Sequence, residues 1–190
     1  MQLLKEKILR EGRVLSGNII KVDSFLNHQI DPILVREIGK EFCRRFGDRG
    51  VSKVLTIESS GIPVALMTGL EMNVPVVFAK KQKSANISET VFASIIESYT
   101  KATTSTVIVS KDYLSSKDRV LIVDDFLAEG QAVIGLSEII KQSGASLIGA
   151  GIVIEKGFQN GCKRLRSLGI HVESLAIIKS IDDGKILFDI

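Results

Sequence analysis

The sequence predicts an α/β fold: a parallel sheet of about five strands flanked by helices, with a small hood formed by the N- and C-terminal segments. Two patterns carry this prediction. Short, fully apolar runs such as residues 120–123 are typical of strands that are buried on both faces of a sheet. Segments with apolar residues at helical spacing alternate with these runs, as they do where helices connect parallel strands. The 190 residues, 45% of them hydrophobic, suffice for a single domain with a sizeable core.

The first elements are helical. Residues 3–11 predict a short amphipathic helix that ends at Gly12. Asp31 and Pro32 are typical of the N-cap and first turn of a second helix. The apolar positions of that helix recur every four residues and predict its buried face: Leu34, Ile38 and Phe42.

The sheet elements follow in chain order. The predicted strands are 54–57, 74–79, 120–123, 147–154 and 172–178. Helices are predicted over 62–71 and 131–142, the second with an inner face of Ala132, Leu136, Ile139 and Ile140.

Residues 82–110 break the alternation of strands and helices. They are rich in Ser and Thr and predict two antiparallel strands, over 91–99 and 104–109, joined near Lys101. Two interpretations remain open. The segment is either a surface hairpin or a mobile cover for a ligand site, because long insertions in compact domains are often lids.

Composition excludes several classes of protein. A net charge of +3 without a dense basic stripe is not typical of nucleic-acid binding. The short cluster of Lys80, Lys81 and Lys83 suits a small anionic ligand better. Cys43 and Cys162, on predicted helices and without metal-ligand spacing, fit a reducing cytoplasm. No apolar run is long enough to span a membrane and the N-terminus lacks a signal peptide, so we expect a soluble cytoplasmic protein.

The clearest functional signal is the run from Val120 to Ala132. Four apolar residues are followed by Asp124 and Asp125, then by small residues, and then by the helix that begins near Gly130. Ligands of parallel sheets bind at the carboxyl ends of the strands, where this segment must lie. Two carboxylates there can accept hydrogen bonds from sugar hydroxyls or hold a divalent cation through water. Solvated acids before an ordinary helix cap are the alternative.

The loop after the acids consists of Ala128, Glu129, Gly130, Gln131 and Ala132. A helix start offers unpaired backbone N–H groups and the positive end of the helix dipole, which suit a phosphate. Gly130 lets the backbone approach an anion closely. Glu129 is expected to point into solvent, because it would repel a phosphate.

This run resembles the 5-phosphoribosyl pyrophosphate (PRPP) motif of the type I phosphoribosyltransferases. That motif has four apolar residues and two acids before a loop that typically reads Ala-Thr-Gly-Gly-Thr. The chain keeps the acids, the alanine and the first glycine, whereas Glu129, Gln131 and Ala132 depart from it. Gln and Ala at the end of the loop are similar to the branch of the family that acts on xanthine. Because two hydroxyls are missing from the loop, the backbone must supply more of the hydrogen bonds to the phosphate.

Three further segments resemble the same branch, in the same order. Residues 22–32 are similar to its N-terminal base-recognition segment, 57–62 to its pyrophosphate loop, and 153–158 to its later base-contacting segment. The resemblance implies that Asp124 and Asp125 are catalytic, that Ser59, Ser60, Gly61 and residues 128–132 bind PRPP, and that Ile20, Asn27 and Lys156 bind xanthine. Lys81 would add positive charge to the PRPP site.

Some of these residues also have plainer interpretations. Ser59 and Ser60 fit a turn before a helix, although a Ser-Ser-Gly loop also suits an anion. Asn27 fits a residue that caps a turn, and Lys156 fits a solvated lysine that follows a strand.

The resemblance implies a reaction and its partners. Xanthine and PRPP would give xanthosine 5′-monophosphate and pyrophosphate in purine salvage, with Mg²⁺ held mainly through PRPP rather than by a protein metal site. Positive charge would develop on the ribose ring in the transition state, and no covalent nucleophile is needed. A homodimer is implied. The alternatives are a guanine, hypoxanthine or adenine transferase, and a non-catalytic PRPP-sensing regulator.

Overall fold

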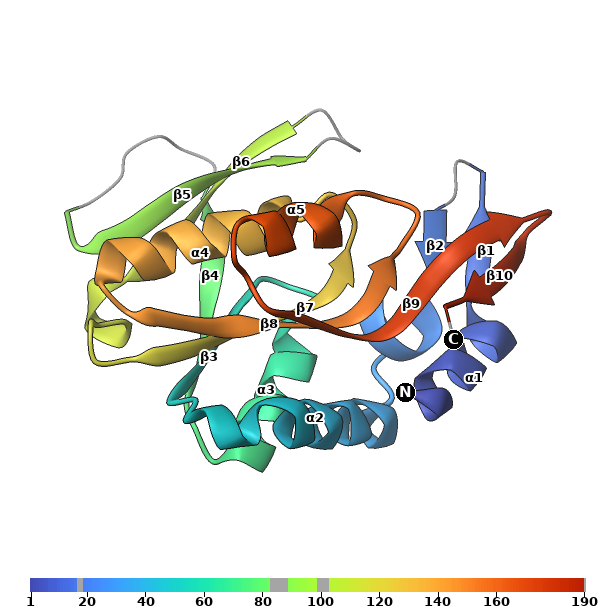
Figure 1. Cartoon of the computed structure of the whole chain (residues 1–190), viewed down its shortest axis with the longest axis horizontal. Helices are drawn as coiled ribbons and strands as arrows, with labels where there is room; N and C mark the ends of the chain where they lie inside the picture. The colour runs from blue at the N-terminus through green and yellow to red at the C-terminus, as the bar shows by residue number, and fades with distance from the viewer. Residues whose placement is uncertain (17–18, 83–88, 99–102, 190) are drawn as a thin grey trace.

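The computed structural model describes residues 1–16, 19–82, 89–98 and 103–189, and Figure 1 shows their arrangement. Within these ranges eight strands form one sheet, in the order β10-β9-β8-β7-β3-β4-β6-β5. The strands of this sheet are β3 Lys53–Ile57, β4 Val76–Gln82, β5 Val91–Ser98, β6 Thr103–Ser110, β7 Arg119–Leu127, β8 Ser146–Lys156, β9 Val172–Asp182 and β10 Lys185–Phe188.

The middle of the sheet is the parallel unit that the sequence predicts. β4, β3, β7, β8 and β9 pair in parallel, which makes five strands. β7 is central and apolar from Val120 to Val123, because helices cover both of its faces. β10 at one edge and the β5–β6 hairpin at the other add antiparallel pairs, so the sheet as a whole is mixed.

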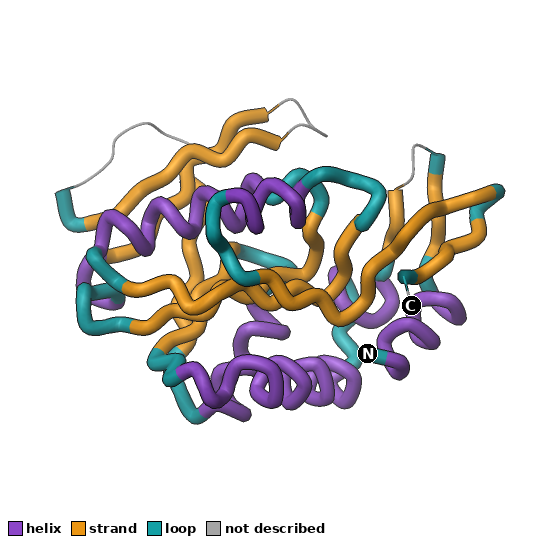
Figure 2. The backbone as a smooth tube through the Cα atoms, viewed as in Figure 1, coloured by secondary structure: helices purple, strands orange, loops and turns teal. Residues whose placement is uncertain are grey.

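Helices form a layer on each face of the sheet. α2 (Pro32–Phe46) and α3 (Ile62–Met72) cover one face, and α4 (Gln131–Ser143) and α5 (Gly161–Ser167) cover the other (Figures 1 and 2). Alternate residues of β7 enter different cores: Val123 packs in the cluster with α2, and Ile122 in the cluster with α4. The predicted cap of α2 is confirmed, since Asp31 Oδ1 accepts hydrogen bonds from the amides of residues 33 and 34, each 3.1 Å long.

Several predicted strand boundaries were wrong. β4 and β9 continue to Gln82 and Asp182, beyond the predicted ends at 79 and 178. β4 starts at Val76 rather than Val74, because Asn73 adopts a left-handed conformation and the Val74 amide bonds back to the Gly69 carbonyl of α3 (2.9 Å). β7 does not end before the acids. It continues to Leu127, since its pairing with β8 extends that far, so Asp124 and Asp125 lie within the strand.

Short elements at one end of the sheet form the hood (Figure 1). They are α1 (Gln2–Glu11), β1 (Arg13–Leu15), β2 (Ile19–Lys21), a π-helical turn over Asp23–Asn27, and β10. Lys5 Nζ donates to the Asp189 carbonyl (2.7 Å), which ties the two terminal segments together. The sequence predicted α1, but it missed β1, β2 and β10, whose three or four residues carry little pattern.

The β5–β6 hairpin lies against α4. The Gln142 side chain donates to the Ala93 carbonyl (2.7 Å) and accepts from the Ala93 amide (3.2 Å), so it pairs with β5 as a strand would. Ile96 fills the space above Gly135, where a Cβ would lie 2.6 Å from Ile96 Cγ1. The predicted turn near Lys101 lies outside the described residues, as does Lys83.

None of the helices in the described part of the chain is both long and apolar enough to cross a membrane.

Candidate active site

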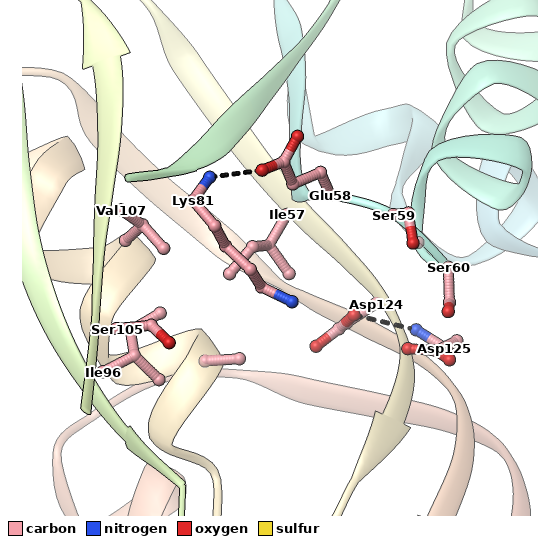
Figure 3. A pocket seen from close by; sticks show the side chains of 12 residues that line it. Ile57, Glu58, Ser59, Ser60, Lys81, Ile96, Ser105, Val107, Asp124 and Asp125 are labelled. Atoms are coloured by element: carbon pink, nitrogen blue, oxygen red, sulfur yellow. Dashed lines mark hydrogen bonds between the residues drawn. The ribbon is translucent and has the colours of Figure 1, made fainter. Parts of the chain in front are cut away.

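A cavity of about 480 Å³ opens at the carboxyl ends of β3 and β7 (Figure 3). Its lining residues are Ile57, Glu58, Ser59, Ser60, Gly61, Lys81, Ile96, Ser105, Val107, Asp124, Asp125 and Ala132. The structure therefore brings together seven of the residues that the sequence singled out, from both predicted phosphate loops, from the pair of acids and, with Lys81, from β4.

The acids occupy the floor of this cavity. Asp124 is only 5% exposed, and its Oδ1 accepts a hydrogen bond from the Asp125 amide (3.0 Å). Burial, and next the negative charge of Asp125, raise the pKa of Asp124 well above its ordinary range. Lys81 acts in the opposite direction, and its side chain points toward the two carboxylates (Figure 3). A cationic or hydroxyl-rich ligand would stabilise the ionised form of Asp124.

The loop between β3 and α3 forms the second wall. Ser59, Ser60 and Gly61 lie at the start of α3, where the first amides of a helix have no helical partner. Glu58, which the sequence analysis missed, accepts a hydrogen bond from the Lys81 amide and so ties this loop to β4. The loop therefore presents amides and hydroxyls to the cavity, a set that suits an anion with several oxygens.

The loop after β7 turns into α4 at Gly130, whose φ of +80° is in the left-handed region. The carbonyl of Ala128 accepts from the Gly161 amide (3.1 Å), so α5 braces the loop from behind. A Cβ on Gly161 would lie 2.2 Å from that carbonyl oxygen, so the brace requires glycine there. Of the five loop residues only Ala132 lines the cavity of Figure 3, and Glu129 is partly buried rather than fully exposed.

Gly130 provides a direct test of this loop. Valine there faces a left-handed backbone that costs about 1–3 kcal/mol, so the loop should shift and its amides should leave their positions. For Gly130→Val we expect the KM for PRPP to rise at least about tenfold while the KM for the purine changes little. Steady-state kinetics with each substrate varied in turn measures both constants.

Gly144 supplies the matched control for that variant. It ends α4 with φ of +75°, at the far end of the helix from the loop of residues 128–132. Gly144→Val should cost similar stability and leave the KM for PRPP unchanged. A similar rise of the KM for PRPP in Gly130→Val and Gly144→Val would contradict a specific role for Gly130.

The residues predicted to bind the base lie elsewhere. Ile20 is in the hood and only 7% exposed, packed in the core cluster that contains α2. Asn27 is exposed at the end of the π-helical turn. Lys156 ends β8, where it is partly buried, and burial lowers the pKa of its ammonium group. None of the three lines the cavity described above.

The hairpin contributes residues that the sequence analysis did not select. Ile96, Ser105 and Val107 line the cavity from β5 and β6. The alternation of the hairpin strands indicated which residues share a face, but not that this face meets the acids. A cover for a ligand site needs such contacts, whereas a simple surface hairpin does not.

Ligand binding should protect the hairpin if it acts as a cover. We expect PRPP with a purine analogue to slow hydrogen exchange of the β6 amides from Thr104 to Val107 several-fold, because closure orders them. Exchange mass spectrometry with and without ligand measures this, and amides in the middle of α2 are the internal control. Equal exchange in both samples would leave only the surface-hairpin interpretation.

Comparisons with known proteins agree on the type of protein. The model of the phosphoribosyl transferase domain matches residues 21–183. The chain is 57% identical over 188 residues to the xanthine phosphoribosyltransferase of Oceanobacillus iheyensis, covering 99% of this chain and 97% of that protein. It is 54% identical to the protein of the same name from Bacillus cytotoxicus, covering 99% and 95%.

Solved structures give the same fold at low identity. The adenine phosphoribosyltransferase of Giardia lamblia superposes with a TM-score of 0.76 at 18% identity, covering 92% of this chain and 96% of that one. The enzyme of the same name from Rhodothermus marinus gives a TM-score of 0.75 at 20% identity, covering 94% and 100%.

Proposed function

The chain belongs to the phosphoribosyltransferase family, and from that premise we propose that it is a xanthine phosphoribosyltransferase of purine salvage. It converts xanthine and PRPP to xanthosine 5′-monophosphate and pyrophosphate. The observation that carries the proposal is the cavity in which two acids, a lysine and an anion-binding loop meet at the end of β7. The choice of xanthine is supported by relatives that bear this name at 53–57% identity.

The acids of the floor suit the ribose. In the transition state the anomeric carbon loses pyrophosphate before the purine nitrogen has fully bonded, so positive charge spreads over the ring. Carboxylates fixed on a strand stabilise that charge and do not have to reorganise. We assign Asp124 and Asp125 to the ribose hydroxyls and to this charge.

The two loops suit the two ends of the donor. We assign residues 128–132 to the 5′-phosphate, which the unpaired amides at the start of α4 would hold. Ser59, Ser60 and Gly61 would hold the pyrophosphate, and Lys81 would neutralise part of its charge. The hairpin would exclude water, which otherwise competes with the purine for the donor.

Phosphoribosyltransferases generally use Mg²⁺ with PRPP, and the cavity fits such an ion. In the described part of the chain no group of three or more His, Cys, Asp or Glu side chains is arranged to hold a metal. Mg²⁺ commonly keeps several waters and binds through one or two carboxylates together with substrate phosphates. The ion would be held mainly through the oxygens of PRPP and would neutralise charge on the leaving group. The negative charge of Asp124 and Asp125 would favour a cation in the cavity.

We assign the base to Ile20, Asn27 and Lys156. Lys156 follows directly from the buried part of β8, and an ammonium group offers three donors and no acceptor. It can therefore meet a purine carbonyl but not an amino group. The lowered pKa of Lys156 reflects burial, and a carbonyl or an anionic base would favour the charged form.

Four broader assignments complete the proposal. The chain forms one domain, with a hood from about 1–30 and the C-terminal segment, and the β5–β6 hairpin acts as a mobile cover. Residues 83–88 and 99–102 of the proposed hairpin segment, about 82–110, lie outside the described residues. The family resemblance implies a homodimer, and the apolar surface that Leu66, Leu70 and Phe78 expose on α3 and β4 supports this assignment. It acts in the cytoplasm, which fits its free cysteines. It acts on small molecules, with neither nucleic acid nor membrane as a partner.

A panel of bases tests the function. The protein is incubated with PRPP, Mg²⁺ and one of xanthine, guanine, hypoxanthine or adenine, and pyrophosphate release and nucleotide formation are measured. We expect xanthine to give the highest kcat/KM and adenine to be nearly inert, because a site built to hydrogen-bond its substrate rejects mismatched analogues strongly. A higher kcat/KM for any other base would overturn the choice of xanthine. If none of the four bases is converted, the proposal that the protein is a purine phosphoribosyltransferase is wrong.

A further inference from the structure

Thr56 has a buried hydroxyl that the assigned chemistry does not use. Its side chain is 0% exposed on β3, one residue before the cavity wall begins at Ile57. Among the described residues its Oγ1 has no hydrogen-bond partner. A buried hydroxyl without a partner costs free energy, and nearly all such groups in proteins are paired. The unpaired Thr56 hydroxyl therefore suggests that its hydrogen-bond partner becomes available in another state of the site, when a ligand is bound.

The surroundings of the hydroxyl identify that partner. Gly61 has ordinary backbone angles, so its lack of a side chain serves space rather than conformation. A Cβ on Gly61 would lie 2.2 Å from Thr56 Oγ1 and 3.3 Å from Asp124 Oδ1. The hydroxyl and the carboxylate therefore border the same small volume beneath the start of α3.

Asp124 is the acceptor that borders this volume beside the hydroxyl, and its side chain is only 5% exposed. Its Oδ1 has one hydrogen bond, from the Asp125 amide, and a carboxylate oxygen has room for a second. A carboxylate that accepts hydrogen bonds from a ribose can also accept one from Thr56, and hydrogen bonds to a carboxylate are stronger than those between neutral groups.

We propose that Thr56 is a positioning residue for Asp124: its hydroxyl donates to the Asp124 carboxylate when PRPP is bound and holds that group against the ribose. The proposal rests on the assignment of Asp124 to the ribose. It makes Thr56 a residue whose hydroxyl contributes to donor binding and contributes nothing to the stability of the free protein.

Thr56→Val replaces the hydroxyl by a methyl group of similar size, and Thr56→Ser keeps the hydroxyl. For Thr56→Val we expect a Tm equal to or above that of the wild type without ligand. We also expect a KM for PRPP raised about 10- to 150-fold, with the KM for the purine unchanged, because a hydrogen bond to a charged group is lost. Thr56→Ser should keep the KM for PRPP within about twofold of the wild type, since the donor remains.

Thr68 supplies the matched control. It is also 0% exposed, but its Oγ1 already donates to the Val64 carbonyl (2.9 Å). Thr68→Val should lower the Tm and leave the KM for PRPP unchanged, the reverse of the result at Thr56. A double-mutant cycle with Asp124→Ala tests whether Asp124 is the hydrogen-bond partner of Thr56. If it is, Thr56→Val should not weaken PRPP binding further in the Asp124→Ala background.

PRPP binding is also measured without turnover, as the rise in Tm on adding PRPP and Mg²⁺. This rise should be smaller for Thr56→Val than for the wild type. If the wild type fails to use xanthine but PRPP still raises its Tm, the choice of base is wrong and Thr56 is still tested. Any of four results would overturn the proposal. PRPP could raise the Tm of Thr56→Val as much as that of the wild type, or Thr56→Ser could lose as much PRPP affinity as Thr56→Val. The Tm of free Thr56→Val could fall below that of the wild type, or Thr56→Val could still weaken PRPP binding in the Asp124→Ala background.

Discussion

Asp124→Asn and Asp125→Asn are each expected to lower kcat at least about 10²-fold, the scale seen when one preorganised charge-stabilising group is removed from an active site. Both acids lie on β7 at the floor of the cavity, so amides there keep the shape but lose the negative charge. That charge matters most when the ribose ring becomes cationic, and kcat should therefore fall more than substrate affinity.

Single-turnover and steady-state kinetics check this result. Asp48→Asn, at an exposed position far from the cavity, is the control for the loss of one carboxylate. Near wild-type kcat in both cavity variants would remove the role assigned to the acids.

Asp124→Asn should raise the stability of the folded protein at neutral pH, although it lowers kcat. The pKa of Asp124 is raised in the folded protein, so its contribution to stability is fully present below its unfolded pKa of about 4 and is lost as the pH rises through the folded pKa. Asparagine carries no charge at any of these pH values. Asp124→Asn should therefore melt above the wild type at neutral pH, and this advantage should vanish near pH 3–4. Thermal melts across that range measure it, and an advantage independent of pH would contradict the raised pKa.

Lys156→Ala is expected to lower kcat/KM for xanthine by about 10- to 150-fold, the loss typical for a charged donor removed from a partly buried site. Burial lowers the pKa of Lys156, so its position is costly for the free protein unless a ligand accepts its hydrogen bonds. The KM for PRPP should change little, because Lys156 does not line the cavity that contains the acids.

Lys163→Ala is the matched control for Lys156→Ala. Lys163 is exposed on α5, seven residues further along the chain, and should leave both kinetic constants unchanged. Full activity of Lys156→Ala and of Asn27→Ala on xanthine would contradict the base assignment and leave the PRPP site intact.

The sequence predicted the parallel unit well, and it singled out residues that the structure brings to one cavity, because both depend on local patterns. The apolar run before Asp124, the Asp31 cap and the glycine at the start of α4 each act within a few residues. The Gln142 contact with β5 and the wall formed by Ile96 and Ser105 join segments far apart in sequence, and no local pattern predicts them. β7 was predicted too short for the same reason, since its last residues are held by pairing with β8.

Thr56 marks the limit of such prediction. Its place in a strand was predicted, but an unpaired hydroxyl becomes visible only when every neighbour is known. Gly61 shows the same limit, because the sequence suggested an anion-binding role while the structure adds a steric one.

The placement of Lys156 and Asn27 away from the cavity that contains the acids has a consequence for how such enzymes diverge. The groups assigned to the donor lie on β4 and β7 and in the loops that follow β3 and β7, whereas those assigned to the base lie on the end of β8 and in the hood. Substitutions in the hood or at the end of β8 can therefore alter which purine is accepted without disturbing the acids. A change of substrate then needs few simultaneous mutations, and intermediate sequences along that path retain a working donor site. Because the assigned base-binding residues are separate from the assigned donor-binding residues, purine preference can evolve while the rest of the protein stays the same.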